Sequence, residues 1–336
     1  MQPIYLTGHS RPVLKVQFNY DGDLLFTCSD DKTVCMYNTY LLERVGLFQI
    51  GDSCKSIDVT KDSKLLLATA TTKGIKCFDT TNGDMLAELT IPGLRQTKQV
   101  ELSYSDKYFA VVYEDMKGSQ IRIFETATVL AFGKKDSGCP DHIMSIEPPK
   151  DHTVTCVKWG PLDETIFYCT DRGRLIQYDV EKHKVVNVAE PHRQEVFSME
   201  ITPDFTMMYT CSRDGTCKLL HPETFDEIRC IKFDFPCRSS SMSPLYAAEE
   251  NQKFHLLVCG GQDAKDVTTT GAGSGGFEIK LYNVIYNESL ANIKGHFGTV
   301  HSVAFHPDGM SFATGSEDGY VHYHRMLPEY FTKRFE

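Results

Sequence analysis

The ten residues SDDKTVCMYN at 29–38 return three more times in recognisable form, as TTKGIKCFDT (71–80), SRDGTCKLLH (212–221) and SEDGYVHYHR (316–325). Each copy is a tight polar turn followed by a short apolar strand that ends in or beside an aromatic or other large residue. Weaker copies read SQIRIFE (119–125), DRGRLIQYD (171–179) and FEIKLYN (277–283). Seven copies of one unit indicate a repeat architecture, because such a unit cannot bury its apolar face alone.

The spacing of the copies identifies the kind of repeat. Between Asn38 and His324, successive copies end 41, 46, 54, 42, 62 and 41 residues apart. A propeller blade of the WD-repeat kind takes about 40–45 residues, and roughly 4–8 blades close a ring. The sequence therefore predicts an all-β protein, a seven-bladed WD40-type β-propeller, as a single domain over residues 1–336.

Each predicted blade begins with a strand that alternates between apolar and polar residues. The clearest are VLKVQF (13–18), KSIDV (55–59), TCVKW (155–159), FSMEI (197–201) and HSVAF (301–305). A turn rich in Asp, Gly, Pro or Ser follows each one, and a second apolar strand comes next. The first segment, PIYL (3–6), has no blade of its own. We expect it to supply the outer strand of blade seven, which closes the ring and removes an exposed edge.

Three repeats carry polar residues in a spacing typical of WD repeats. A His before the first strand, a Thr in the second, an Asp in the tight turn and an aromatic in the third strand are expected to share hydrogen bonds. The sets are His9, Thr27, Asp31 and Tyr37 in blade one, His192, Thr210 and Asp214 in blade five, with Leu220 at the aromatic place, and His296, Thr314, Asp318 and Tyr323 in blade seven. Because they recur at equivalent places, we interpret them as structural rather than catalytic.

Composition narrows the function classes. The chain has a net charge of −10, and an acidic protein is repelled by phosphate backbones, so direct nucleic-acid binding is not expected. The 12 cysteines form no CxxC pair, which disfavours zinc, and several fall in predicted strands, which predicts free buried thiols in a reducing compartment. The start MQPIYLTGHSR does not resemble a signal peptide, and no apolar run reaches the ~18 residues of a membrane helix.

Insertions lengthen three of the spacings, at 126–150, 244–253 and 262–276. The last is glycine-rich, so a phosphate-binding loop must be considered. Such a loop needs a Lys directly after its last Gly and a following helix, whereas here no Lys follows and the strand FEIKLYN comes next. Signatures of serine hydrolases, zinc proteases and kinases are also absent from the sequence. We therefore predict no catalytic, cofactor-binding or metal-binding residues.

Several segments resemble one family. They are IYLTGHSRPVLKVQFNYDGDLLFTCSDD (4–31), WGPLDET (159–165), GGQDAKDVTTT (260–270), GGFEIKLYN (275–283), KGHFGTVHSVAFHPDGMSFATGSEDGYVHYHR (294–325) and PEYFTKRFE (328–336). Together they resemble the i subunit of eukaryotic translation initiation factor 3 from end to end, with blades two and three the least typical. The GGQ…DVTTT segment carries most of the identification, because a generic WD-repeat propeller does not need it.

The resemblance implies a cytoplasmic, non-catalytic scaffold that joins a large assembly on the small ribosomal subunit and supports preinitiation complex assembly and scanning. In that family the C-terminal segment of the b subunit lies against loops of blades five and six, and the g subunit is a second partner. The matching positions here are Asp204 and His221. Many relatives carry an acidic residue at the second position, and His221 departs from that pattern. Neither membrane association nor a homo-oligomer is expected.

The residues around Asp204 suit such a contact on physical grounds. Asp204, Phe205, Met242 and Pro244 combine an acidic group with apolar surface, which would complement a helix that carries Arg and an aromatic residue. With His221, and with Gln262 of the GGQ segment, they form the predicted partner-binding set. Alternatively, Asp204 only completes the turn after Pro203.

Two other functions stay open at this point. Another WD-repeat adaptor would share the fold but should lack the GGQ…DVTTT segment. A propeller hydrolase would need convergent carboxylates or metal ligands around the central channel, and the sequence shows no such set.

Overall fold

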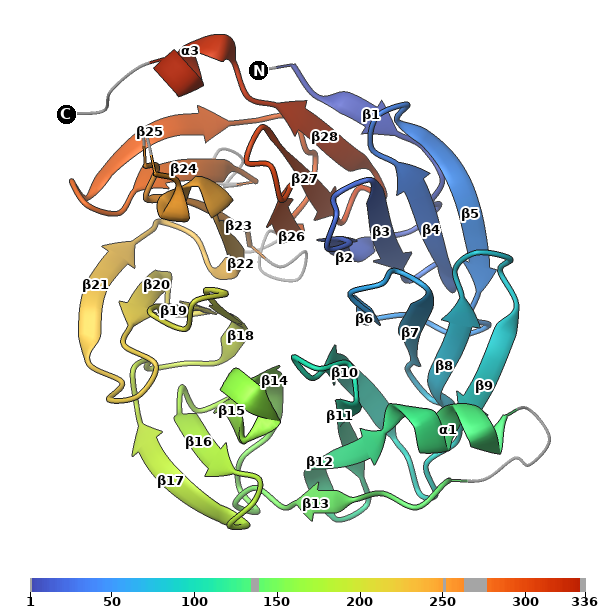
Figure 1. Cartoon of the computed structure of the whole chain (residues 1–336). Coiled ribbons are helices and arrows are strands. Elements are labelled where there is room, and N and C mark those ends of the chain that lie inside the picture. The colour runs from blue at the N-terminus through green and yellow to red at the C-terminus, as the bar shows by residue number, and fades with distance from the viewer. Residues whose placement is uncertain (1, 134–138, 250–251, 263–276, 333–336) are drawn as a thin grey trace.

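The computed structural model describes residues 2–133, 139–249, 252–262 and 277–332. Within them lie seven antiparallel sheets of four strands each, which stand side by side in a ring around a central channel (Figure 1). This arrangement confirms the predicted all-β, seven-bladed propeller.

In blades one to six the strands follow one another in chain order from the channel outward, and in blade seven the outer strand is the first strand of the chain. Blades one to four contain, in turn, β2 (Val13–Phe18), β3 (Leu24–Ser29), β4 (Thr33–Asn38) and β5 (Glu43–Gln49); β6 (Ile57–Val59), β7 (Leu65–Ala70), β8 (Gly74–Asp79) and β9 (Met85–Leu89); β10 (Gln96–Leu102), β11 (Tyr108–Asp115), β12 (Gly118–Glu125) and β13 (Met144–Ile146); β14 (Val154–Trp159), β15 (Thr165–Thr170), β16 (Leu175–Asp179) and β17 (Lys184–Ala189).

Blades five to seven complete the ring. They contain, in turn, β18 (Val196–Ile201), β19 (Met208–Ser212), β20 (Thr216–Leu220) and β21 (Glu227–Lys232); β22 (Cys237–Met242), β23 (His255–Gly260), β24 (Ile279–Asn283) and β25 (Glu288–Ile293); β26 (Val300–Phe305), β27 (Ser311–Ser316), β28 (Val321–Arg325) and β1 (Ile4–Leu6). The described helices are short: α1 (Thr126–Phe132), η1 (Pro161–Asp163), η2 (Pro244–Ala247) and α3 (Pro328–Thr332).

The first strand closes the ring, as predicted. β1 pairs antiparallel with β28, with Ile4 opposite Tyr323 and Leu6 opposite Val321. Leu6 is only 3% exposed and packs in the apolar cluster between blades seven and one. The two ends of the chain thus share one sheet, and β1 covers the edge of β28.

The predicted insertion at 126–150 is more than a connection between blades. It contains α1 and then β13, which pairs with β12 through Ile146 opposite Ile121 and so forms the outer strand of blade three. A strand of three residues leaves too short an alternation to be recognised in sequence. The insertion at 244–253 begins with η2, and the loop at 263–276 lies outside the described residues.

Apolar side chains fill the spaces between neighbouring blades, and blades seven and one approach closely. At Gly315 in β27, a Cβ atom would lie 2.7 Å from Cγ1 of Val13 in blade one. Only glycine fits there, because real Cβ contacts are essentially never that short and both sides belong to packed strands. The blade-to-blade interface is therefore set by backbone approach as well as by side-chain volume.

A β-bulge recurs near the start of the innermost strand in every blade except blade two. The register shifts lie between Val13/Lys15, Thr97/Gln99, Val154/Cys156, Val196/Ser198, Cys237/Ser239 and Val300/Ser302. A bulge puts two successive residues opposite one partner residue. Both residues at each bulge, such as Phe197 and Ser198, line the central channel.

The predicted polar networks form around their histidines. In blade one, His9 contacts Thr27 through Nε2 at 2.8 Å and Asp31 through Nδ1 at 2.9 Å. In blade five the corresponding distances from His192 to Thr210 and Asp214 are 2.8 and 3.3 Å, and in blade seven those from His296 to Thr314 and Asp318 are both 2.9 Å. Each His is buried and hydrogen-bonded through both ring nitrogens, which fits a structural role.

Blade seven departs from the prediction in its aromatic residue. Tyr323 points away from the network and shares a hydrogen bond of 2.6 Å with the hydroxyl of Ser311. His322 lies opposite Thr314 in the sheet and stacks on His296, with ring centroids 3.6 Å apart. Since side chains alternate along a strand, the place held by Tyr37 in blade one belongs to His324 in blade seven. Leu220 holds it in blade five, where it is 1% exposed.

The cysteines behave as predicted. All 12 are free, and ten of them are buried, including Cys28, Cys35, Cys77, Cys211 and Cys217 in the strands. Burial raises the pKa of the Cys77 thiol to about 12. These side chains act as small apolar groups of the blade interiors.

We expect Leu6→Ala to lower the free energy of unfolding by about 2–5 kcal/mol, because it leaves a cavity beside the strand that closes the ring. Deleting residues 1–7 should destabilise the whole protein and not merely trim its start. Urea unfolding followed by circular dichroism measures both effects. Leu41→Ala, at a side chain that is 68% exposed, should change stability by less than about 0.5 kcal/mol. Equal effects at the two leucines would contradict this account of closure.

The buried histidines of blade seven predict a loss of stability in acid. Burial, with the neighbouring histidines, lowers the pKa of His324 to about 3 and that of His322 to about 4. At pH values between these lowered pKa values and the ordinary histidine pKa of about 6.5, the unfolded chain binds protons that the folded chain does not. The free energy of unfolding therefore falls as the pH drops through this range.

His324→Phe should reduce that acid sensitivity. His324 stacks on Phe312 with centroids 4.6 Å apart, and neither ring nitrogen has a hydrogen-bond partner within the described residues. Phenylalanine can keep the stack while it removes a group that must stay neutral. Urea unfolding at pH 7 and pH 5 should show a smaller difference than in the parent, whereas His142→Phe at an exposed site should leave the difference unchanged.

Candidate functional site

The predicted partner-binding residues gather on one face of the ring, with one exception. We call the end face the side on which the innermost strand of each blade ends, and the start face the opposite side. Because strands alternate in direction, loops after the first and third strands lie on the end face, and loops after the second and fourth lie on the start face. Asp204, Phe205, Pro244 and His221 therefore belong to the end face.

Neighbouring loops of the end face contact one another around the channel. The contacts are Asn19 Nδ2 to Ser63 Oγ at 2.9 Å, Lys61 N to Asp106 Oδ2 at 2.8 Å, Ser103 Oγ to Asp163 Oδ2 at 3.0 Å and His306 Nε2 to the Gly22 carbonyl at 2.7 Å. In addition, the Tyr104 ring meets the Phe205 ring edge-on with centroids 6.2 Å apart. These contacts make the end face a set of mutually braced loops.

Asp204 completes the turn that follows β18. Its Oδ1 accepts hydrogen bonds from the backbone N–H of Thr206 at 3.2 Å and from the Thr206 hydroxyl at 2.9 Å. The next residue, Phe205, has a φ of 55°, in the left-handed region that non-glycine residues seldom adopt. The Asp204 side chain is exposed, so it both closes the turn and faces solvent.

The same turn recurs in other blades. Asp62 in blade two accepts from the Lys64 N–H at 3.1 Å, and Asp308 in blade seven accepts from the Met310 N–H at 2.7 Å. The turn role of Asp204 is therefore structural and shared. Asp204 differs from Asp62 in its surroundings, because blade six places Tyr246 beside it.

The carboxylate of Asp204 is held ionised by its hydrogen bonds. Partial burial opposes ionisation, but hydrogen bonds from Thr202, Thr206 and Tyr246 outweigh it and lower the pKa of Asp204 below its ordinary value. Tyr246 is only 9% exposed. Its hydroxyl forms a hydrogen bond with the Asp204 carboxylate and so orients it. The sequence offered no signal for this contact, since the two residues are far apart in the chain and on different blades.

Two of the predicted residues do not belong to this surface. Met242, at the end of β22, is 6% exposed and packs in the apolar cluster of blades five and six. Gln262 follows β23 and so lies on the start face, where its carbonyl accepts a hydrogen bond from the Thr299 hydroxyl at 2.5 Å. Burial separates Met242 from the exposed Asp204, and strand direction places Gln262 on the opposite face, so a partner role for these two residues stays a prediction.

Pro244 and His221 lie on the same end face as Asp204. Pro244 opens η2 and is partly exposed, in a turn capped by Ser243, whose Oγ accepts from the Leu245 N–H at 3.4 Å. His221 follows β20, and its Nδ1 accepts from the Glu223 N–H at 3.3 Å. Both side chains are partly exposed, the Pro244 ring on a capped turn and the His221 ring held by its own hydrogen bond.

Two exposed apolar residues extend this surface and were not predicted. Ile285 and Tyr286, in the loop after β24, are 51% and 54% exposed. Arg229 of blade five fixes the position of this loop by donating a hydrogen bond to the Ile285 carbonyl at 3.1 Å. The sequence signal that could have found them is the pair of large apolar residues in the turn VIYNES (284–289).

The site offers an ionised acid beside apolar surface, which suits a protein partner rather than a metal. In the part of the chain that the structure describes, one group of three side chains has the spacing of metal ligands: His296, Asp318 and His322. It does not fit a metal, because His296 already uses both ring nitrogens on Asp318 and Thr314. None of the described helices is long and apolar enough to cross a membrane.

Comparison with known proteins identifies relatives over the full length. The family model described as EIF3I matches residues 1–336. A protein of Drosophila pseudoobscura pseudoobscura named eukaryotic translation initiation factor 3 subunit I is 33% identical over 339 residues and covers 100% of both chains. Proteins of the same name are 32% identical in Drosophila melanogaster, over 100% of both chains, and 34% identical in Dictyostelium discoideum, over 98% of this chain and 96% of the relative.

Proposed function

The chain belongs to the EIF3I family of translation initiation factor subunits, and from this premise we propose that it is a non-catalytic scaffold that docks other subunits of initiation factor 3. The observation that carries the proposal is the ionised, exposed Asp204, next to the partly exposed Phe205, on a braced end face that also bears the exposed Ile285 and Tyr286. A rigid propeller with loops on two faces is suited to hold partners in fixed positions.

The proposed first partner is the C-terminal segment of the b subunit, as a helix laid on the end face of blades five and six. A basic and an aromatic side chain on that helix would complement Asp204 and the apolar residues Phe205, Pro244 and Tyr286. Interfaces of this kind draw most of their affinity from a few anchors in their centre. His221 lies where an acidic residue would add to the attraction, so Asp204 carries more of the charge complementarity here.

The remaining parts of the proposal follow from family membership. We infer that the g subunit is a second partner, that the chain acts as one domain without a cofactor or a catalytic site, and that it does not form a homo-oligomer. It would reach the small ribosomal subunit through the assembled factor, in the cytoplasm, without sequence-specific contact to nucleic acid. A net charge of −10 supports the last point.

Asp204→Lys should weaken binding of the isolated b-subunit segment by about 1–3 kcal/mol, because it replaces an attraction with a repulsion at the centre of the surface. Calorimetric titration of the segment into the whole chain measures the change. Asp62→Lys is the matched control, since Asp62 makes the same turn in blade two and should leave the affinity unchanged. Equal losses in both variants, or none in Asp204→Lys, would contradict the proposed contact.

The scaffold role itself is tested by recovery of partners. Tagged chain drawn from a cytosolic extract of its own organism should bring down initiation factor 3 subunits, with b and g the most abundant by mass spectrometry. Recovery of a different stable complex would favour another WD-repeat adaptor, and enzymatic turnover by the purified chain would contradict the non-catalytic assignment.

A further inference from the structure

The central channel has a charge arrangement that the docking function does not use. Its volume is about 380 Å³, within the range of about 300–1,000 Å³ typical of small-molecule sites. All seven blades contribute to its wall through residues in or directly before their innermost strands. The bulges turn one extra residue of most of these strands toward the channel, so the wall carries more polar side chains than plain alternation would give.

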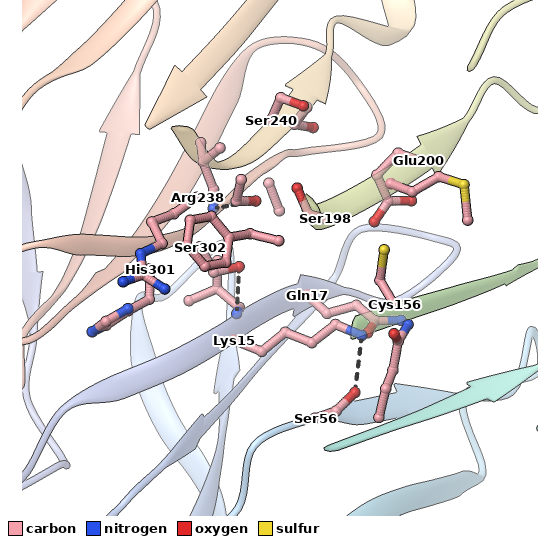
Figure 2. A pocket seen from close by; sticks show the side chains of 18 of the residues that line it. Lys15, Gln17, Ser56, Cys156, Ser198, Glu200, Arg238, Ser240, His301 and Ser302 are labelled. Carbon is pink, nitrogen blue, oxygen red and sulfur yellow. Dashed lines mark hydrogen bonds between the residues drawn. The ribbon is translucent and has the colours of Figure 1, made fainter. Parts of the chain in front are cut away.

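The mouth of the channel on the start face is ringed by cations. One channel-facing residue from each blade, in or just before its innermost strand, forms this ring, and the charged or titratable members are Lys55, Lys98, Arg238 and His301. No member of the ring is acidic, and all of them lie within the described residues. Lys15, one residue deeper, reaches across to blade two (Figure 2). A chain with a net charge of −10 thus carries a concentrated positive charge at this place.

Within the described residues, two lysines at this mouth, Lys15 and Lys55, form no ion pair and bind neutral groups instead. Lys98 pairs with Glu114 at 2.7 Å, and His301 pairs with Glu317 at 2.6 Å. By contrast, Lys55 donates to the neutral Gln96 Oε1 at 3.0 Å, and Lys15 donates to the Ile57 carbonyl at 2.9 Å. Burial, and to a lesser degree the charge of Lys98, lowers the pKa of Lys55, and an anion beside the ammonium group would favour its charged form.

Hydroxyl groups face the same space. Ser198 Oγ and Thr155 Oγ1 are buried and have no hydrogen-bond partner within the described residues, and Figure 2 shows Ser198 in the pocket near Arg238. Buried hydroxyls in proteins are normally paired. Here they could donate to an anion held between the cations of opposite blades.

The deeper part of the channel carries negative charge, which limits how far an anion could enter. There Lys158 is shared between Glu101 at 2.5 Å and Glu200 at 2.9 Å. The surplus of carboxylates repels an anion from this level. A ligand would therefore sit at the mouth, between the start face and the Lys158 cluster.

We propose that the start-face mouth of the channel is a binding site for a compact polyphosphate, a small molecule with at least two phosphate groups. Phosphate oxygens accept hydrogen bonds from many directions, as the ammonium, guanidinium and hydroxyl groups around the ring require. Arg238, whose guanidinium lies 3.9 Å from the centre of the Phe197 ring, adds a planar donor suited to phosphate. The site is independent of Asp204 and of the proposed docking face.

The test is calorimetric titration of inorganic pyrophosphate into the full chain at a fixed ionic strength of about 0.1 M, which screens long-range charge. Saturable binding of one equivalent is expected. The double variant K15Q/K55Q should weaken it by at least about tenfold, because it removes two charged donors, whereas K64Q at a lysine side chain that is 71% exposed should not change it. Lys98 is not substituted, because its loss would remove the ion-pair partner of Glu114.

Three results would overturn the proposal: no saturable binding, equal loss in K64Q and K15Q/K55Q, or citrate binding as tightly as pyrophosphate, which would show a charge effect without preference for phosphate. Circular dichroism and thermal unfolding confirm that each variant is folded. If the double variant does not fold, the single variants K15Q, K55Q and S198A decide, each expected to weaken pyrophosphate binding by about threefold or more.

Discussion

The pairing of β1 with β28 is the constraint on which the other features depend. A blade cannot bury its faces alone, so each sheet needs a neighbour on both sides, and the last neighbour exists only when the chain's two ends share a sheet. Leu6 and Val321 lie in one apolar cluster that also holds Val13 and Tyr37 of blade one. Through this cluster, a strand of three residues connects blade seven to blade one and closes the ring.

The sequence predicts this fold well because the repeat has a physical period. The polar network was also visible, since His, Thr and Asp must recur at matched places to satisfy one another's hydrogen bonds. Two details of the strands were predicted incorrectly or missed, and strand geometry explains both. Choosing Tyr323 in place of His324 is a shift of one residue, and such a shift exchanges the two faces of a strand. β13 was not predicted, because its three residues follow a helix and are too few to show an alternation of apolar and polar side chains.

The candidate site was only partly predictable for a different reason. Local sequence identifies Asp204 and Phe205 as a turn, but whether a residue reaches the surface depends on packing between blades. Met242 and Pro244 are two residues apart, yet one fills the core between blades five and six and the other is partly exposed. Gln262 lies at the opposite end of a strand, on the other face. Contacts between blades, such as Tyr246 to Asp204, join residues that no sequence pattern connects.

The two faces of the ring carry different charged groups, and the direction of the innermost strands explains this difference. Each runs from the start face to the end face, so its first channel residues and its last turn belong to opposite surfaces. The first residues bring cations together at the channel mouth, and the last turns bring acids and braced loops to the other side. Because the end-face loops already hold one another, a partner would order little of the chain on binding, which lowers the entropic cost of association. Rigidity that arises from closing the ring therefore suits the propeller to the proposed scaffold role.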